Sequence, residues 1–584
     1  MDRMPESTPD LPNARIAELF DELGDLYELD GAVVHRVMAY RNAAKAVRDA
    51  QRSVAALTRA GTVTSLPGIG KTLEEKLVAL VQTGTIPALD RLREQFPPGL
   101  LAMTRLPGLG PKRARKLYDE LKIDSLEALA QAAREEKLRD VKGFGPKFEE
   151  SVLAAIAAGH GAEGSRRIPM HRALETAAPI IEALRAHPAS DQVHVAGSAR
   201  RMADSAKDLD VIATASDPRA LLEAFAALPD LQSAHVPGDN AAKGVTHNGL
   251  SIDVRVVEPD QLGNLLQHFT GSKMHNVALR AASVRKGLHI SEYGILDDAT
   301  GETHRCATEE EVYALLGLPY IPPELREDRG ELAFRTAADV PVLIEQEDLK
   351  GDLHMHTVAS DGRGTIREMA EAALARGLEY IAITDHSASH GFGNDVSPDE
   401  LRRQIERVRE VDADLDGITV LVGSEVNILP DGSLDYDDEL LAELDWVVAS
   451  VHTQFAMDER RMTARIIRAL EHPSVDVLGH PTGRKIEQRA AYALDMDAVI
   501  DAAGRTGTFL EINSAPDRRD LHDVHARAAA ALGVLLCIDS DAHGPEKLGV
   551  TGWGVGTARR AWLTARDVAN TRPWAELDQL RKAR

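Results

Sequence analysis

The sequence predicts a multidomain protein with an all-helical N-terminal part, an α+β central part and a C-terminal parallel α/β barrel. Three observations support this. A Gly-x-Gly unit recurs three times within residues 66–148, two aspartates alternate with apolar residues at 208–213, and apolar runs alternate with helical segments beyond residue 350. At 584 residues the chain is long enough for several domains, each with its own core.

Composition limits the cellular setting. Cys306 and Cys537 lie far apart in unrelated contexts, which favours a reducing compartment without disulfides or a cysteine-based zinc site. The first residues contain no apolar signal region, and the chain has no run of about 18 apolar residues. We therefore expect a soluble, cytoplasmic protein that does not bind membranes.

The N-terminal part is basic although the whole chain carries a net charge of −24. Helical periodicity covers residues 11–60, and residues 31–150 hold 21 lysines and arginines against 14 aspartates and glutamates. A tight Gly-x-Gly turn that opens a helix points unpaired backbone N–H groups at an anion. One copy is weak support for this role, but three copies in a basic region predict binding to DNA phosphates through Gly68, Gly70, Gly108, Gly110, Gly143 and Gly145. The units resemble helix-hairpin-helix motifs.

The central part carries a candidate acidic site. Asp208 and Asp210 are two residues apart in a predicted strand, so both carboxylates face one side, and Asp253 alternates with Ile252 and Val254 in a second strand. Carboxylates together with phosphate oxygens suit Mg²⁺. An isolated Asp-x-Asp is more often a solvated strand end, but here a Gly-Ser turn that begins at Gly197 precedes it, with nine residues between the two.

The Gly-Ser turn, the nine residues after it and the Asp-x-Asp strand resemble the nucleotidyltransferase signature. Arg200-Arg201 and the Ile-Asp-Val-Arg strand narrow the resemblance to the family X DNA polymerases. The resemblance implies that Asp208 and Asp210 hold two Mg²⁺ or Mn²⁺ ions and that Asp253 binds one of these ions and helps to activate the primer 3′-hydroxyl. It also implies that Gly197, Ser198 and Arg201 hold the triphosphate of a dNTP.

Residues 265–276 resemble the Phe-Thr-Gly-Ser segment of the same family. The resemblance implies that Phe269 and Gly271 pack under the nucleotide sugar, that Asn276 touches the base and that Arg280 faces the DNA template; an ordinary turn before a helix is the alternative. Two positions depart from the family pattern: Ala206-Lys207 replaces small residues before the first acid, and His268 replaces an aromatic residue.

Lys76 lies late in the first hairpin unit, where family members can carry a lysine that forms a Schiff base with an abasic sugar. Tyr40-Arg41 matches the aromatic-basic pair that precedes that lysine. A Schiff-base lysine needs its pKa lowered by burial or by neighbouring charge. A solvated phosphate contact is an equal alternative for Lys76.

The C-terminal part places metal-ligand residue types at or just past the ends of its apolar runs. Because active sites of α/β barrels form at the C-terminal ends of the strands, these side chains are expected to converge. Any one histidine alone would more often be structural, but nine ligand types in step with the strands predict a metal cluster. They are His354, His356, Asp361, His386, Glu425, His452, His480, Asp541 and His543.

These nine residues fill the ligand pattern of the polymerase-and-histidinol-phosphatase (PHP) domain, which residues 348–584 resemble. The resemblance implies a seven-stranded (β/α)7 barrel with up to three ions, and mixed histidine and carboxylate ligands suit Mn²⁺ or Zn²⁺. Closely spaced ions of this kind promote phosphoester hydrolysis.

Together the resemblances cover nearly the whole chain and are typical of a bacterial family X DNA polymerase with a C-terminal PHP domain. This family fills gaps in base excision repair, and its PHP domain is associated with Mn²⁺-dependent 3′→5′ exonuclease activity and, in some members, cleavage at abasic sites. The expected partners are gapped or nicked DNA and dNTPs, and we expect a nucleoid-associated monomer.

The expected domains follow the motifs and the Pro-rich breaks. They are a lyase-like helical domain (1–88), a helical fingers domain (89–166), a palm (167–262), a thumb (263–325), a linker (326–347) and the PHP domain (348–584).

Two rival functions remain: a DNA repair nuclease whose palm is a weak or inactive scaffold, and a small-molecule phosphatase, against which the DNA-binding repeats count.

Overall fold

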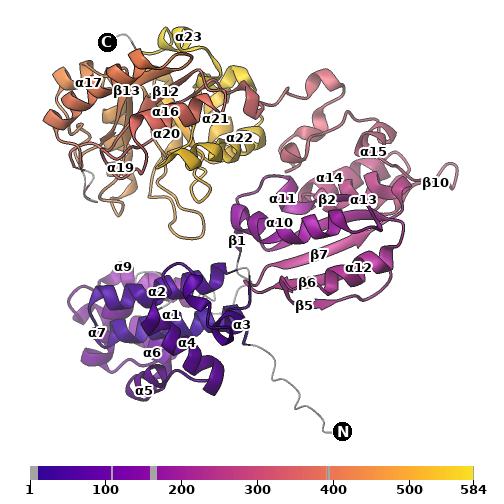
Figure 1. Cartoon of the computed structure of the whole chain (residues 1–584), viewed down its shortest axis with the longest axis horizontal. Helices are drawn as coiled ribbons and strands as arrows, with labels where there is room; N and C mark the ends of the chain where they lie inside the picture. The colour runs from indigo at the N-terminus through magenta and orange to yellow at the C-terminus, as the bar shows by residue number, and fades with distance from the viewer. Residues whose placement is uncertain are drawn as a thin grey trace. The chain divides into compact units, whose positions relative to one another are not determined.

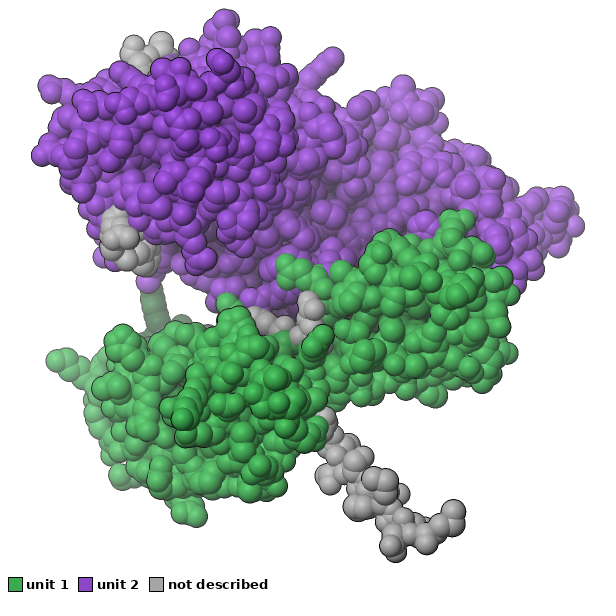
Figure 2. Space-filling view, viewed as in Figure 1, with its two compact units in different colours: residues 1–166, 175–193, 207–256 green, residues 167–174, 194–206, 257–584 purple. Residues whose placement is uncertain are grey.

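The computed structural model describes residues 11–50, 52–104, 106, 109–157, 167–389, 391 and 395–582. The chain divides into two compact units, shown in green and purple in Figure 2. The first comprises residues 1–166, 175–193 and 207–256, and the second comprises residues 167–174, 194–206 and 257–584.

The N-terminal part of the first unit is helical, as the periodicity predicts (Figure 1). Apolar residues of these helices, including Phe20, Leu23, Leu77 and Leu117, form one buried core. The helices are α1 (Asn13–Leu29), α2 (Val34–Asp49), α3 (Val54–Arg59), α4 (Lys71–Thr83), α5 (Pro87–Gln95), α6 (Pro98–Thr104), α7 (Pro111–Leu121), α8 (Leu126–Arg134) and α9 (Pro146–Ala157).

The predicted hairpin turns precede helices. Gly70 is the N-cap of α4 and Gly110 is the N-cap of α7, while Gly145 directly precedes α9. Arg113 of α7 donates to the carbonyl oxygen of Gly143 at 2.9 Å and its guanidinium lies over the rings of Phe144 and Phe148. The second and third hairpin units therefore pack against each other.

The central sheet has the strand order β2-β4-β7-β6-β5. The strands β4 and β7 run parallel, whereas β5, β6 and β7 pair antiparallel. Helices of this region are α10 (Met170–Ala186), through which the boundary between the units passes, and α12 (Pro218–Ala226). The strands are β2 (Ser190–Val195), β4 (Asp208–Ala215), β5 (Leu231–His235), β6 (Ala241–Thr246) and β7 (Ser251–Val256).

The second unit begins with short elements around the Gly-Ser turn and with the expected thumb. Strand β1 (Ile168–Pro169) pairs with β3 (Ser205–Ala206), and the short helix α11 (Gly197–Arg200) contains the turn. The thumb elements are α13 (Leu262–Thr270), α14 (Lys273–Val284), β8 (Leu288–Ser291), β9 (Gly294–Asp297), β10 (Thr303–His304) and α15 (Glu309–Leu315).

The stretch expected as a linker, residues 326–347, is packed. Arg326 is fully buried; it donates to Glu309 at 2.5 Å and to the carbonyl oxygen of Ile321 at 2.8 Å. Glu331 is also fully buried and contacts His275 at 2.7 Å. The charged stretch predicted as a linker is therefore anchored by buried partners.

The C-terminal part is the predicted barrel. Its parallel sheet, with order β11-β12-β13-β14-β15-β16-β17 among the described residues, is nearly closed by a parallel bridge between Met355 and Ala542 beyond the two edge strands. The strands are β11 (Gly351–Asp352), β12 (Tyr380–Ile383), β13 (Thr419–Asn427), β14 (Trp446–Ser450), β15 (Val477–Leu478), β16 (Phe509–Asn513) and β17 (Leu536–Asp539).

Both faces of the barrel strands are buried, which explains the unbroken apolar runs. Tyr380 and Trp446 belong to one apolar cluster, while Ile381 and Val447 pack in the other. Helices lie around the strands (Figure 1). They are α16 (Ile366–Leu374), α17 (Pro398–Asp414), α18 (Asp438–Ala442), α19 (Glu459–Leu470), α20 (Met496–Thr506), α21 (Asp523–Ala531), α22 (Thr551–Arg560) and α23 (Trp574–Asp578).

Cys306 and Cys537 are buried free thiols. Among the described residues no helix is long and apolar enough to cross a membrane.

Candidate active sites

The barrel brings the nine predicted ligand residues to the C-terminal ends of its strands. His354, His356 and Asp361 follow β11, His386 follows β12 and Glu425 lies in β13. His452 follows β14, His480 follows β15, and both Asp541 and His543 follow β17. This arrangement follows from parallel strands, whose carboxyl ends meet at one rim.

Glu425 lies at the centre of this cluster. Its side chain is 1% exposed, and its two carboxylate oxygens face five histidines. The nitrogen–oxygen distances are 2.8 Å to His386 and His480, 3.1 Å to His452, 3.5 Å to His354 and 3.6 Å to His356. A carboxylate with ligands on both sides is suited to bridging two cations.

Three groups of side chains within the described residues hold their donor atoms within 4.8 Å of one another. Buried His356 Nδ1 has no hydrogen-bond partner among the described residues, as expected of a ligand atom. The donor set of imidazole nitrogens and carboxylate oxygens fits divalent ions. The groups are His356, Asp361, His386 and His543; His354, His356 and Asp541; and His386, Glu425 and His452.

The protonation states of two of these residues favour cation binding. Burial acts to raise the pKa of Asp541, but nearby His354 and His356 outweigh it and hold that pKa well below its usual value. Burial and the charge of Arg518 lower the pKa of His480 to about 3, and this leaves a neutral imidazole at neutral pH. Ionised carboxylates and neutral imidazoles are the forms that bind metals.

Strand β16 supplies a residue that the sequence patterns did not reveal. Glu511 is fully buried; it contacts His354 Nδ1 at 2.6 Å and accepts from the backbone N–H of His480. It thus orients two ligands from outside the metal groups. The sequence feature that could have indicated Glu511 is its position as a glutamate within the apolar run Phe509–Ile512.

Two further residues that were not predicted flank Asp541. Asn513 donates to its Oδ2 at 3.0 Å, and Arg518 Nε lies 3.6 Å from the same oxygen. The side chain of Arg518 is 17% exposed, so it adds a positive charge at the edge of the cluster. Such a charge suits a phosphate-containing substrate.

The palm acids lie on paired parallel strands. The register sets Asp210 of β4 opposite Asp253 of β7, and it sets Asp208 opposite Ser251. Buried Leu209, Ile252 and Val254 point to the other face, so the three carboxylates share one face.

The surroundings of the palm acids are more open than those of the barrel. Asp208 is exposed, whereas Asp210 and Asp253 are half-buried. Lys243 of β6 is the strand neighbour of Asp253 and its Nζ lies 3.1 Å from Asp253 Oδ2. The other oxygen, Oδ1, is buried without a hydrogen-bond partner among the described residues, which fits a cation ligand.

The two arginines of the Gly-Ser turn pair with residues of the thumb and of the segment that follows it. Gly197 has a φ of 62°, and both Gly197 and Ser198 belong to α11. Arg200 pairs with Glu309 at 2.6 Å. Arg201 pairs with Glu327 at 3.0 Å and donates to the carbonyl oxygen of Thr270 at 2.6 Å. A triphosphate would compete with Glu327 for Arg201.

The Phe-Thr-Gly-Ser segment joins α13 to α14. Gly271 is the C-cap of α13, while Ser272 caps α14 by accepting from the N–H of His275. The Asn276 amide donates to the carbonyl oxygen of His268 at 2.7 Å, and Arg280 contacts the His268 ring at 3.0 Å. Phe269 is half-buried and its ring lies 5.3 Å from that of His268.

Lys76 lies half-buried on α4 in the helical part. Burial and the neighbouring Tyr40 raise the pKa of Tyr27, and Lys76 acts in the opposite direction, so the lysine lies near this tyrosine pair. The rings of Tyr27 and Tyr40 stack at 5.1 Å, whereas Arg41 pairs with Asp25 and Glu28.

The described hairpin glycines have open space around them. A Cβ built on any of them meets no other atom within 4 Å, and Gly68 and Gly143 have positive φ, which glycine adopts without strain. Their backbone can therefore approach a ligand closely. They are Gly68, Gly70, Gly110, Gly143 and Gly145, whereas Gly108 lies outside the described residues.

Four parts of the chain match known families. Residues 11–86 match a helix-hairpin-helix domain and residues 100–158 match a SAM-like helix-hairpin-helix tandem. Residues 265–327 match the DNA polymerase beta thumb, and residues 352–515 match the PHP domain. In this order, with the acids and ligands described above, they define a family X DNA polymerase that carries a PHP domain.

A relative along the whole chain establishes the family. The protein from Bacillus subtilis (strain 168) described as DNA polymerase/3′-5′ exonuclease PolX is 38% identical over 569 residues, which cover 97% of this chain and 99% of that protein. The chain therefore belongs to the family X DNA polymerases with a C-terminal PHP domain.

Other relatives match a smaller share of the chain. A probable phosphatase from Caldanaerobacter subterraneus subsp. tengcongensis is 33% identical over 203 residues, which cover 33% of this chain and 75% of that protein. A probable phosphatase from Thermoanaerobacter sp. (strain X514) is 33% identical over 239 residues, which cover 38% of this chain and 89% of that protein.

Proposed function

We propose that this protein fills short gaps in DNA during base excision repair and that its barrel removes nucleotides from 3′ ends, with cleavage at abasic sites as a further activity of the barrel. The observation that carries the proposal is that one chain bears two separate acidic centres, the carboxylates of β4 and β7 and the ligand cluster of the barrel. The probable phosphatases match 33% and 38% of the chain.

In the palm, Asp208, Asp210 and Asp253 would hold Mg²⁺ or Mn²⁺. Divalent ions, when bound, neutralise phosphate charge and lower the barrier to phosphoryl transfer. Asp253 helps to activate the primer 3′-hydroxyl, whose oxygen attacks the α-phosphorus of a dNTP as pyrophosphate leaves. Gly197, Ser198 and Arg201 hold the triphosphate, and Phe269, Gly271, Asn276 and Arg280 face the nucleotide and the template.

In the barrel, the nine ligand residues would hold up to three Mn²⁺ or Zn²⁺ ions. Glu511 keeps His354 in one orientation through a 2.6 Å contact, and Arg518 attracts the phosphate of the scissile bond. Hydrolysis of the last phosphodiester bond at a 3′ end requires no base-specific contact, so we expect little sequence preference.

DNA binding by the hairpin glycines can be tested without disturbing the fold. Gly70, Gly110 and Gly145 lack positive φ and have open space, so a triple change to alanine should leave the melting temperature unchanged. The added methyl groups obstruct phosphates at the backbone N–H groups. Binding to gapped DNA should weaken, and the slope of log K against log salt should become less negative by about one for each phosphate that the variant no longer binds.

The control for the glycine test is Gly504→Ala in the barrel, where the nearest atom to an added Cβ lies at an ordinary 3.5 Å. Wild-type affinity and salt slope in the triple variant would contradict the phosphate-binding role of the hairpins.

The two activities can be separated on a one-nucleotide gap with a labelled primer, in Mn²⁺ with and without dNTP. Asp208→Ala/Asp210→Ala should abolish extension and keep shortening, whereas His354→Ala/His356→Ala should do the reverse. If the wild-type protein only shortens the primer, the palm is a scaffold and the chain is a repair nuclease. Rapid phosphate release from a free phosphate monoester would instead favour a phosphatase.

A further inference from the structure

The segment Arg201–Asp204, which follows the Gly-Ser turn, is held by arginines of the barrel within the second compact unit. Arg519 lies just beyond β16 and is 1% exposed. Its guanidinium donates to the carbonyl oxygen of Met202 at 2.7 Å and to that of Ala203 at 2.9 Å. Its Nε donates to Thr557 at 2.9 Å, so one buried side chain is engaged on all sides.

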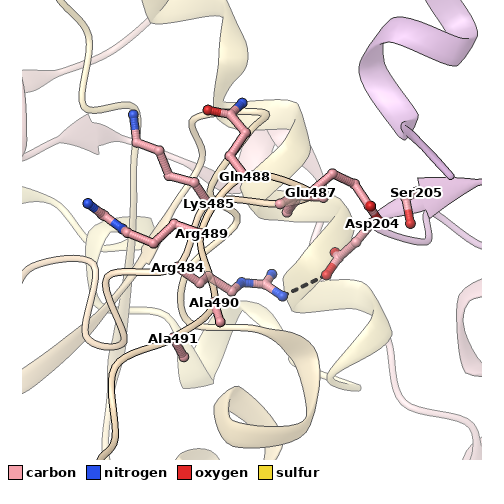
Figure 3. A pocket seen from close by; sticks show the side chains of 10 residues that line it. Asp204, Ser205, Arg484, Lys485, Glu487, Gln488, Arg489, Ala490 and Ala491 are labelled. Carbon is pink, nitrogen blue, oxygen red and sulfur yellow. Dashed lines mark hydrogen bonds and ion pairs between the residues drawn. The ribbon is translucent and has the colours of Figure 1, made fainter. Parts of the chain in front are cut away.

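Asp204 lies between two guanidinium groups. Arg484, four residues after the ligand His480, donates to Asp204 Oδ2 at 2.7 Å, and Arg519 lies 3.4 Å from Oδ1. Figure 3 shows Arg484 directed at Asp204. Both residues line a cleft of about 490 Å³ together with Ser205 and residues 485–491. Arg484 also donates to the carbonyl oxygen of Arg519, which links the two arginines.

Helix α22 completes this contact. Arg560 donates to the carbonyl oxygen of Arg201 at 2.7 Å and to Glu327 at 2.8 Å, and Glu327 also accepts from Arg201. A Cβ on Gly556 would lie 2.5 Å from Met202 Cε, so the helix backbone and the segment are in close contact. The segment therefore has little freedom to shift without losing buried hydrogen bonds.

The held segment is connected directly to the turn. The backbone N–H of Ala203 donates to the carbonyl oxygen of Ser198 at 3.0 Å, and Asp204 precedes Asp208 by four residues. Displacement of Met202 and Ala203 would therefore displace Ser198 as well. Arg201, whose backbone is held by Arg560, would move with them.

We propose that Arg519 and Arg484 are positioning residues for nucleotidyl transfer, which hold Arg201–Asp204 and thereby place the turn that receives the dNTP triphosphate. This inference rests on the proposed role of Gly197, Ser198 and Arg201. It makes the barrel part of the polymerase machinery, in addition to its own hydrolytic site.

The test is gap filling by the full chain, with kcat and KM for dNTP measured separately. Arg519→Lys keeps the charge but cannot span the two carbonyl oxygens and Thr557, so KM for dNTP should rise by about tenfold or more. Arg484→Ala should raise KM by a smaller factor. Exonuclease activity on single-stranded DNA should stay within about twofold of wild type, since neither arginine is a proposed metal ligand.

Arg468→Ala is the matched control, because Arg468 is an exposed barrel arginine that pairs with Asp431 at 3.3 Å. Asp204→Asn, alone and combined with Arg484→Ala, tests the ion pair: the double variant should be no worse than the more impaired single variant. This cycle remains informative if Arg519→Lys folds poorly.

Three outcomes overturn the inference. An unchanged KM in Arg519→Lys with wild-type extension would overturn this inference but not the proposed polymerase function. Independent, additive effects of Asp204→Asn and Arg484→Ala would do the same. An equal loss of extension and exonuclease with a lowered melting temperature would show a structural contact only. If the wild-type protein does not extend a primer, the proposed polymerase function fails first.

Discussion

The two acidic centres of this chain differ in how much of each is built by the protein itself. In the barrel, Glu425 is 1% exposed and faces five histidines. In the palm, Asp208 is exposed and Asp253 pairs with Lys243, whose side chain is 61% exposed. The barrel centre is enclosed and rich in ligands, whereas the palm presents three carboxylates on an open face.

This difference matches the chemistry of the two proposed reactions. Nucleotidyl transfer brings phosphate oxygens with the dNTP, so protein carboxylates need to supply only part of the coordination shell. Hydrolysis at a 3′ end brings fewer phosphate oxygens, and the barrel supplies most ligands from its own strands. We therefore expect changes in the barrel to affect metal binding without DNA, and changes in the palm to affect it mainly with substrate.

The largest expected effect is that of Glu425→Gln. Loss of the charge that faces five histidines should remove bound metal from the barrel and lower exonuclease activity by at least about 100-fold, while primer extension stays near wild type. Metal content after dialysis and both activities are measured. Glu511→Gln should cost about 10- to 100-fold because it acts through His354.

Glu443→Gln, at a 47% exposed barrel glutamate, is the control for these changes. Retention of full exonuclease activity by Glu425→Gln would show that the cluster is not the hydrolytic site, and the contrast between the two centres would fail.

The next effect is the pH dependence of metal binding in the barrel. Burial lowers the pKa of His386, but Glu425 and Asp361 outweigh it and raise this pKa to about 10. Without metal, His386 therefore carries a proton at neutral pH, and a cation must displace it. The apparent affinity for Mn²⁺ should rise with pH by about tenfold per unit for each proton released and level off near pH 10.

Titration calorimetry of the Asp208→Ala/Asp210→Ala protein at pH 6, 7 and 8 tests this, since the palm then contributes no site. Two buffers of different ionisation enthalpy report the number of protons released. An affinity that does not change with pH would mean that metal binding displaces no proton from His386.

The sequence predicted that these side chains converge, because a parallel sheet brings strand ends together whatever the intervening helices do; their metal binding stays a prediction. The barrel strands alternate with helices as the apolar runs predicted, and His354, Glu425 and Asp541 lie in or just beyond strands. The paired acids Asp210 and Asp253 follow from the same reasoning, because alternation fixes which face a strand residue occupies.

Residues whose partners are distant in sequence could not be predicted in this way. Glu511 reads as one residue of an apolar strand, and only the packed barrel shows its contact with His354. Arg326 falls in the predicted linker, but it is buried and pairs with Glu309, which lies 17 residues before it. Lys243 pairs with Asp253 because β6 and β7 are antiparallel neighbours, a register that neither strand specifies alone.

The smallest expected effect concerns Lys243 and tests the difference between the two centres in the palm. Because this exposed ion pair is worth about 0.2–1 kcal/mol, Lys243→Ala should free Asp253 for a cation and lower the Mg²⁺ concentration that gives half-maximal extension by up to about fivefold. Exonuclease activity should not change, and Lys243→Arg, which keeps the charge, should behave as wild type. A higher Mg²⁺ requirement or a raised KM for dNTP in Lys243→Ala would mean that the lysine binds substrate phosphate instead, so that β6 contributes a cation beside the three carboxylates.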